Sequence, residues 1–179
     1  MSDQLRNLLS SKKPLDFQSF ARLLTIIERL GPSCLEENEL LEPPRAALRV
    51  GITGPPGAGK STLVGKMIGE FRKQDLKVGV LAVDPSSPVS NGAILGDRIR
   101  YSDLFNDEQV FIRSLGTRGS LGGLSASAYL MLRAFDFWEF DVVLIETVGV
   151  GQTELEIMHV ADIVSVILVP ESGDAVQAM

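Results

Sequence analysis

The stretch GPPGAGKST at residues 54–62 decides how the rest of this chain is read. Its first eight residues match the phosphate-binding pattern G-x-x-x-x-G-K-[ST] at every fixed position. An apolar, strand-like run at residues 47–53 precedes it, and residues 61–72 after it read as a helix. A glycine-rich turn can match by accident, but strand, loop and helix in this order are the context in which the pattern binds phosphate. The sequence therefore predicts a nucleotide-binding loop.

The spacing of the loop has a chemical reason. Glycines allow the backbone to curl so that its N–H groups point inward, and the positive end of the following helix adds to the attraction for phosphate. Lys60 is predicted to reach the β- and γ-phosphates and to act in catalysis, and Ser61 to offer its hydroxyl to Mg²⁺. The residues expected to contact the nucleotide are Gly54, Pro55, Pro56, Gly57, Ala58, Gly59, Lys60, Ser61 and Thr62.

Composition excludes several classes of function. The 179 residues carry a net charge of −6 with no basic stripe, which disfavours nucleic acid as the main partner. The single cysteine rules out an internal disulfide. With only one cysteine and one histidine in the chain, a Cys/His metal centre is also disfavoured. No apolar run approaches the roughly 20 residues that span a bilayer, and the N-terminus lacks a signal-peptide pattern. A cytoplasmic protein is expected.

Apolar periodicity divides the chain into two parts. Residues 1–44 are expected to form an N-terminal helical segment and linker, with a helix that ends at Gly31-Pro32. Residues 45–179 are expected to form the nucleotide domain, in which continuous apolar runs are typical of parallel strands covered on both faces. The fold class is α/β, a mostly parallel sheet with helices on both faces. The strands are expected at 47–53, 77–84, 110–115, 141–146 and 163–169, and the domain's helices at 61–72 and 126–137.

Acidic residues end two of these strands, at the sheet edge where such folds bind ligands. Glu146 is expected to hold Mg²⁺ and take part in catalysis, and Gly149 to offer a backbone N–H to the γ-phosphate. Asp84 either helps to hold the metal or begins a Pro-Ser turn. Gln152 either orients the attacking water or only opens a helix. A glycine-rich stretch at residues 116–123 is either a connection or a further contact to nucleotide or partner.

Six segments in order make the chain similar to the GTPases of the MeaB/ArgK group, also labelled LAO/AO transport ATPases or kinases. The segments are GPPGAGKST, VDPSS, NGAILGDRIR, TRGSLGGLS, ETVGVGQTE and VPESGD. The resemblance implies a SIMIBI-type fold, a P-loop NTPase that commonly works as a homodimer, with GTP/GDP and Mg²⁺ as ligands. It places Asp84, Asp97 and Glu146 at acidic metal and switch positions. It also implies slow GTP hydrolysis that gates adenosylcobalamin delivery to, and protection of, methylmalonyl-CoA mutase.

The chain departs from that group because it has no N-K-x-D segment to read guanine and no C-terminal dimerisation part. It is therefore expected to be an incomplete domain with uncovered apolar strand surface, and with poor solubility or weak nucleotide affinity. Three alternatives stay open. They are an ATP-dependent kinase or ATPase linked to lysine, arginine or ornithine transport, a metallochaperone GTPase, and a nucleotide-regulated interaction module without turnover.

Overall fold

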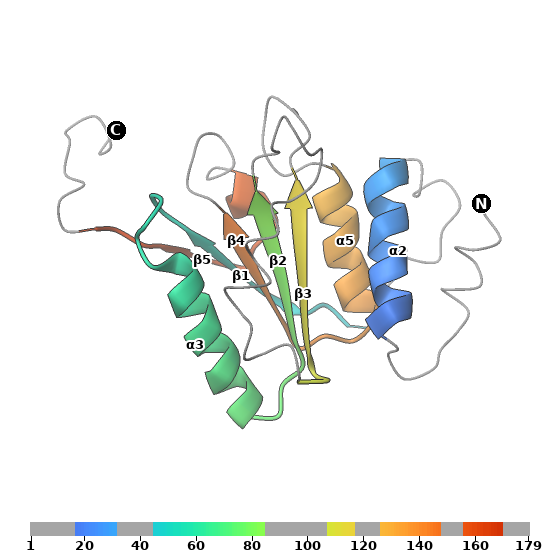
Figure 1. Cartoon of the computed structure of the whole chain (residues 1–179), viewed down its shortest axis with the longest axis horizontal. Coiled ribbons are helices and arrows are strands. Elements are labelled where there is room, and N and C mark those ends of the chain that lie inside the picture. The colour runs from blue at the N-terminus through green and yellow to red at the C-terminus, as the bar shows by residue number, and fades with distance from the viewer. Residues whose placement is uncertain (1–16, 32–44, 85–106, 117–125, 148–155, 170–179) are drawn as a thin grey trace.

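A computed structural model describes residues 17–31, 45–84, 107–116, 126–147 and 156–169. These residues form two long helices on one side of a five-stranded sheet and one on the other, so that the sheet is the middle layer (Figure 1). In chain order the elements are α2 (Phe17–Leu30), β1 (Leu48–Thr53), α3 (Lys60–Lys73), β2 (Val78–Asp84), β3 (Val110–Gly116), α5 (Ala126–Phe137), β4 (Val142–Thr147), the 3₁₀ helix η4 (Ile157–His159) and β5 (Ile163–Val166).

The strands lie in the order β3-β2-β4-β1-β5, and every described pairing is parallel. Strand β4 therefore lies between β1 and β2, although it comes after both in the chain. Because these pairings are parallel, the carboxyl ends lie at one edge of the sheet, the edge toward which the arrows of β2 and β3 point in Figure 1. This arrangement confirms the predicted α/β fold with a parallel sheet and helices on both of its faces.

Alternation along the strands divides the core into two apolar clusters. All six residues of β4 are buried, as expected of a central parallel strand covered on both faces. Val142 and Leu144 pack on the face covered by α3, together with Val64 and Ile68 of that helix. Val143 and Ile145 point to the opposite face, which α5 and α2 cover. We call these the α3 face and the α5 face.

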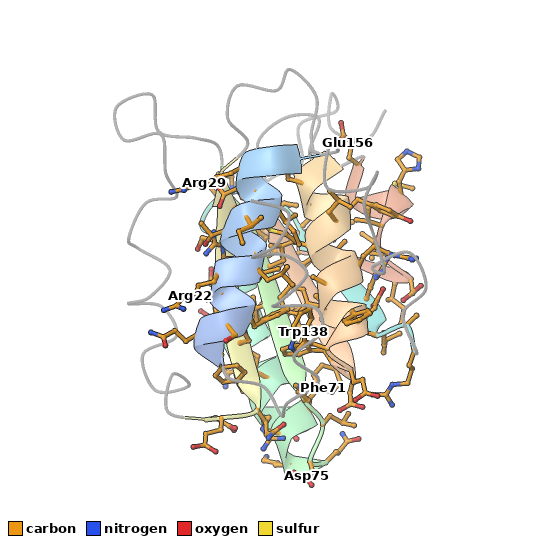
Figure 2. The ribbon with its side chains drawn as sticks, turned by 90° about the vertical axis from the view of Figure 1, so that its right-hand side faces the viewer. Arg22, Arg29, Phe71, Asp75, Trp138 and Glu156 are labelled. Atoms are coloured by element: carbon orange, nitrogen blue, oxygen red, sulfur yellow. The ribbon has the colours of Figure 1, made fainter. Side chains whose placement is uncertain are left out.

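The N-terminal helix α2 is part of the core of the domain. Its residues Phe20, Leu23, Leu24 and Ile27 recur at helical spacing and are all fully buried. The Phe20 ring lies edge-on to Phe111 and to Phe135, and Figure 2 shows α2 and α5 side by side in front of the sheet. The helix ends at Gly31, which has the left-handed φ of +56° that favours glycine after a helix. The predicted helix and its end are confirmed.

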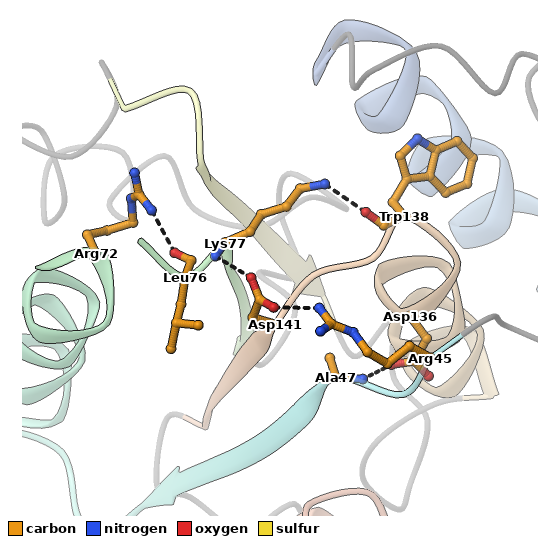
Figure 3. Close-up of polar contacts among 8 residues, drawn as sticks. All are labelled: Arg45, Ala47, Arg72, Leu76, Lys77, Asp136, Trp138 and Asp141. Carbon is orange, nitrogen blue, oxygen red and sulfur yellow. Dashed lines mark hydrogen bonds and ion pairs between the residues drawn. The ribbon is translucent and has the colours of Figure 1, made fainter. Parts of the chain in front are cut away.

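Two aspartates join the elements at the amino end of the sheet (Figure 3). Asp136 of α5 accepts a hydrogen bond from the Ala47 backbone N–H at 2.9 Å and pairs with Arg49. Asp141 accepts from the Lys77 backbone N–H at 2.7 Å and from Arg45 at 2.5 Å. Burial alone would raise the Asp141 pKa, but these two hydrogen bonds and the nearby positive charges hold it below its ordinary value.

Strand β5 is shorter than predicted. The sequence favoured a strand at 163–169, whereas the structure has Ile163–Val166. The reason is that β5 pairs only with β1 among the described strands, and β1 ends at Thr53, whose carbonyl accepts the last bond, from Ile167 N–H at 2.8 Å. Side chains of this edge, Ile163, Val166 and Leu168, are exposed. In the described part of the chain no helix has the length and apolar character to cross a membrane.

Candidate nucleotide site

The phosphate loop begins at Gly54, immediately after β1 ends. Gly54 has φ +138°, and a Cβ there would lie 2.2 Å from the Ile167 carbonyl oxygen. No side chain fits, because the obstacle is backbone that is itself held in place by its hydrogen bond to Thr53. Glycine at this position therefore lets β1 and the segment after β5 approach while the chain turns into the loop.

The middle of the loop is open to solvent. Gly57 and Gly59 have left-handed φ values of +78° and +89°, and nothing lies within 4 Å of the place where either Cβ would be. Pro55 and Ala58 close a turn, since the Ala58 N–H donates to the Pro55 carbonyl at 3.3 Å. Helix α3 starts directly after Gly59, so its first amides lie beside the loop. Such a curled backbone at a helix start is a binding place for an anion.

Lys60 is the first residue of α3 and folds back over the loop. Its Nζ donates to the Gly54 carbonyl at 2.8 Å and to the Pro55 carbonyl at 2.9 Å, and the residue is only 6% exposed. These two bonds fix the ammonium group above the backbone curl. A phosphate oxygen entering the curl would meet this positive charge.

Ser61 and Glu146 meet at the carboxyl edge of the sheet. The Ser61 hydroxyl donates to Glu146 Oε1 at 2.6 Å, and Glu146 is 7% exposed. Glu146 lies on β4 next to β1, where its Cα pairs with that of Ile52. Hydroxyl and carboxylate oxygens are the donors that Mg²⁺ prefers, so this pair fits the ion. No cluster of three or more His, Cys, Asp or Glu forms among the described residues, and Mg²⁺ commonly uses only one or two protein ligands.

A pair of threonine hydroxyls lies on the same two strands, and the sequence interpretation did not include it. The Thr147 hydroxyl donates to the Thr53 hydroxyl at 2.9 Å, and both residues are buried. Thr53 ends β1 and Thr147 ends β4, so the pair joins the strand before the loop to the strand that carries Glu146. The sequence did show that a threonine ends each of these two apolar strands. Only the strand order shows that Thr53 and Thr147 are neighbours.

The remaining predicted residues are described in part or not at all. Strand β2 ends at Asp84, and Ala82, two residues earlier, pairs with Glu146 of β4. The Asp84 backbone thus reaches the same edge of the sheet. The side chain of Asp84, the whole of Asp97, Gly149 and Gln152, and residues 117–123 of the glycine-rich stretch at 116–123 lie outside the described residues. Thr62, in the first turn of α3, is exposed.

A comparison with protein families matches residues 20–179 to the family described as Methylmalonyl Co-A mutase-associated GTPase MeaB. The chain belongs to the MeaB family. The match begins within α2 and runs through the loop, Glu146 and β5, so it covers every element of the candidate site. The predicted family is confirmed.

Curated relatives include proteins named as GTPases. A putative GTPase of Pyrococcus abyssi is 47% identical over 173 residues, which cover 96% of this chain and 53% of the relative. GTPase ArgK of Escherichia coli is 44% identical over 132 residues, 74% of this chain and 40% of that protein. The mouse protein named methylmalonic aciduria type A homolog, mitochondrial, is 42% identical over 134 residues, 73% of this chain and 32% of its own length.

A solved structure titled LAO/AO transport system kinase has a TM-score of 0.62 and 27% sequence identity. The similarity covers 93% of this chain and 49% of the solved one. This MeaB-family chain thus spans about half the length of the Pyrococcus abyssi relative and of that solved structure.

Proposed function

We propose that the chain is the nucleotide-binding part of a Mg²⁺-dependent GTPase. The observation that carries the proposal is the convergence of a buried lysine and a hydroxyl–carboxylate pair on one open glycine loop. Lys60 bonds to the loop carbonyls, and Ser61 bonds to Glu146 at 2.6 Å, both at the carboxyl edge of a parallel sheet. Family membership and the GTPase names of the relatives support the reaction.

The loop amides and Lys60 each have a proposed role in the transfer of the γ-phosphoryl group to water. The backbone amides of residues 57–59 bind phosphate oxygens in the open curl of the loop. Lys60 exchanges its two carbonyl acceptors for oxygens of the β- and γ-phosphates, so that its charge offsets the charge on the transferring group. The attacking water forms the new P–O bond as the bond to the β-phosphate oxygen breaks, which yields GDP and inorganic phosphate.

Ser61 and Glu146 would hold the magnesium ion. The ion supplies charge stabilisation to the β- and γ-phosphate oxygens when it is bound. The Ser61 hydroxyl could donate its proton to Glu146 and offer an oxygen lone pair to the ion at the same time, so the pair would hold the ion without separating. Asp84 and Asp97 are proposed as further metal residues, Gly149 as an amide donor to the γ-phosphate, and Gln152 as the group that orients the water.

The first experiment compares binding of fluorescent GDP and ADP with Mg²⁺ in this chain and in Lys60→Ala. We expect a preference for GDP and a loss of affinity of about ten- to hundredfold in Lys60→Ala, since charge-assisted hydrogen bonds contribute about 1.5–3 kcal/mol. Lys66→Ala is the matched control, because Lys66 is an exposed lysine on the same helix. Equal binding of both nucleotides, or a preference for ADP, would support the ATP-dependent kinase instead.

Release of inorganic phosphate then separates an enzyme from a binding module. With GTP and Mg²⁺ we expect slow release in the chain, much less in Lys60→Ala, and unchanged release in Lys66→Ala. Binding without release would support the interaction module. Transfer of the γ-phosphate to an added acceptor, in place of release, would support the kinase.

We also propose a partner. The family description names methylmalonyl-CoA mutase, and the proposed role is to gate delivery of adenosylcobalamin to that enzyme and to protect it, with the GTPase working as a homodimer in its full-length form. The test adds purified mutase to the phosphate-release assay. We expect faster release, with comigration of the two proteins on a sizing column that depends on the nucleotide. No stimulation and no comigration would remove the mutase from the proposal and leave the GTPase.

A further inference from the structure

Two threonine side chains join β1 and β4 at the point where the backbone pairing of these strands stops. The parallel ladder between β1 and β4 runs up to the residues just before Thr53 and Thr147. The Thr53 backbone pairs instead with Val166 of β5, and the Thr147 backbone with Val83 of β2, on the opposite side. The hydrogen bond between the two hydroxyls, 2.9 Å long, spans from one strand end to the other.

A second side-chain bond lies one residue earlier, on the other face of the sheet. Glu146 follows Leu144 by two residues on β4, so its side chain lies on the α3 face, where Ser61 donates to it at 2.6 Å. Thr147 follows Ile145 by two residues and therefore lies on the α5 face. The end of β4 is thus bonded on one face to the start of α3 and on the other face to the end of β1.

The threonine bond connects the phosphate loop to the carboxylate of the candidate site. Thr53 is followed directly by Gly54, whose carbonyl accepts from Lys60 at 2.8 Å. Thr147 is preceded directly by Glu146. The bond therefore joins the residue before the loop to the residue after the proposed magnesium ligand. Thr53 is 3% exposed and Thr147 is 0% exposed, so the bond lies in a buried environment, where it is stronger than in water.

We propose that the hydrogen bond between Thr53 and Thr147 positions Glu146 relative to Ser61 for the binding of Mg²⁺ with nucleotide. This inference rests on the proposed function. The two hydroxyl oxygens lie 2.9 Å apart, whereas two methyl groups in contact lie about 3.5–4.0 Å apart. An apolar pair would therefore separate the strand ends by up to about 1 Å. That shift is large for an ion that demands nearly ideal ligand distances of about 2.0–2.1 Å.

Thr53 and Thr147 are positioning residues, because they act through Glu146 and not on the nucleotide or the ion. The alternative is that their bond only satisfies two buried hydroxyls, and valine, which has nearly the shape of threonine, separates the two. In Thr147→Val the Thr53 hydroxyl stays buried without its partner, so the melting temperature should fall. In the double variant Thr53→Val with Thr147→Val neither hydroxyl remains, and most of the melting temperature should return.

GDP affinity with Mg²⁺ and with EDTA measures the positioning. Mg²⁺ is expected to raise the affinity of the wild type, and this increase should be about three- to tenfold smaller in Thr147→Val, since groups that orient metal ligands affect metal affinity strongly. The increase should stay smaller in the double variant, although its stability has returned. In EDTA the affinity of both variants should stay within about twofold of the wild type.

Two further variants serve as rescue and control. Thr147→Ser keeps the hydroxyl and should keep the wild-type effect of Mg²⁺. Thr25→Val removes a threonine hydroxyl that donates to the Ala21 carbonyl within α2, at 2.9 Å, and should leave GDP affinity unchanged with and without Mg²⁺. A wild-type effect of Mg²⁺ in the double variant would overturn the proposal. An equal loss of affinity with Mg²⁺ and with EDTA would overturn it too, because the loop and not the metal ligand would then have moved.

Hydrogen exchange without nucleotide tests the separation of the strand ends. Amides of residues 52–54 and 145–147 should exchange faster in the double variant than in the wild type, and Thr25→Val should leave them unchanged. Equal exchange in the double variant and the wild type would overturn the inference, whatever the binding assays show. Failure of the proposed function is distinguishable, because it is seen in the wild type alone, as the absence of Mg²⁺-dependent GDP binding, and the positioning role would fall with it.

Discussion

The two ends of the sheet use carboxylates in different ways. At the amino end, Asp136 and Asp141 accept hydrogen bonds from the backbone N–H groups of Ala47 and Lys77 (Figure 3). Each aspartate also pairs with an arginine, Asp136 with Arg49 and Asp141 with Arg45. At the carboxyl end, Glu146 accepts from the hydroxyl of Ser61. A backbone donor cannot leave without moving a strand, whereas a serine hydroxyl can rotate toward an ion.

This difference explains why one end is structural and the other is suited to binding. The carboxylates at the amino end fix the starts of β1 and β2 relative to α5 and β4. At the carboxyl end, a phosphate can replace the two carbonyl acceptors of Lys60, and Ser61 and Glu146 offer neighbouring oxygens to a cation. Substitutions at the amino end should therefore change stability, and those at the carboxyl end should change ligand binding.

The largest effect on stability is expected from Asp136→Ala. It leaves the half-buried Arg49 without its partner and the buried Ala47 N–H without its acceptor. Breaking a buried pair in this way costs about 3–5 kcal/mol, which urea unfolding would measure. Glu70→Ala is the control, since its exposed pair with Lys73 should contribute less than about 1 kcal/mol. If Asp136→Ala lowers the free energy of unfolding by less than about 1 kcal/mol, the proposed structural role of the carboxylates at the amino end is wrong.

Gly54→Ala tests the one position at the carboxyl end where stability should also suffer. The new Cβ would meet the Ile167 carbonyl oxygen at 2.2 Å, and φ is +138°. We expect a loss of about 2–4 kcal/mol, because overpacking and backbone strain each cost about 1–3 kcal/mol. Gly57→Ala, also at positive φ but with open space around it, should lose about half as much. Equal melting temperatures for the two variants would contradict this order.

Asp141 should make the stability of the protein depend on pH in the acidic range. Its folded pKa lies below the ordinary value of 3.8, so its contribution to stability is complete above that value. As the pH falls through 3.8 toward the lower folded pKa, the contribution is lost. Asp141→Asn should reduce stability at pH 7 by about 1–3 kcal/mol and flatten the loss below pH 4, as followed by circular dichroism. A parallel acid profile in wild type and variant would exclude Asp141 as its cause.

The smallest change in stability is expected from Glu146→Gln, because an amide oxygen can still accept from Ser61. The free energy of unfolding should change by less than about 1 kcal/mol. Mg²⁺ is expected to raise nucleotide affinity, and this increase should be about tenfold smaller in Glu146→Gln than in the wild type, since the charge that binds the cation is gone. The measurement is GDP binding with Mg²⁺ and with EDTA in both proteins. An unchanged Mg²⁺ effect would show that Glu146 is not a magnesium ligand.

Local signals in the sequence were enough for most elements. The glycine spacing predicted the loop from Gly54 to Ser61, and apolar periodicity predicted α2 and its end at Gly31, both of which the structure bears out. Strand β5 was predicted too long, because its apolar run continues to Val169 while its partner β1 stops at Thr53. An apolar run shows what is suited to a strand, and only the partner decides where pairing ends.

By itself, the sequence determined the elements, the phosphate loop and the residue types at its edge, because these depend on neighbours within a few positions. Only the tertiary structure decided that β4 lies between β1 and β2, which brings Glu146 to Ser61, 85 positions away, and Thr147 to Thr53, 94 positions away. The same holds for Ile157 on Gly51 and Asp136 on Ala47. Contacts across such separations follow from strand order and from the shapes that pack on it, and no local pattern encodes either.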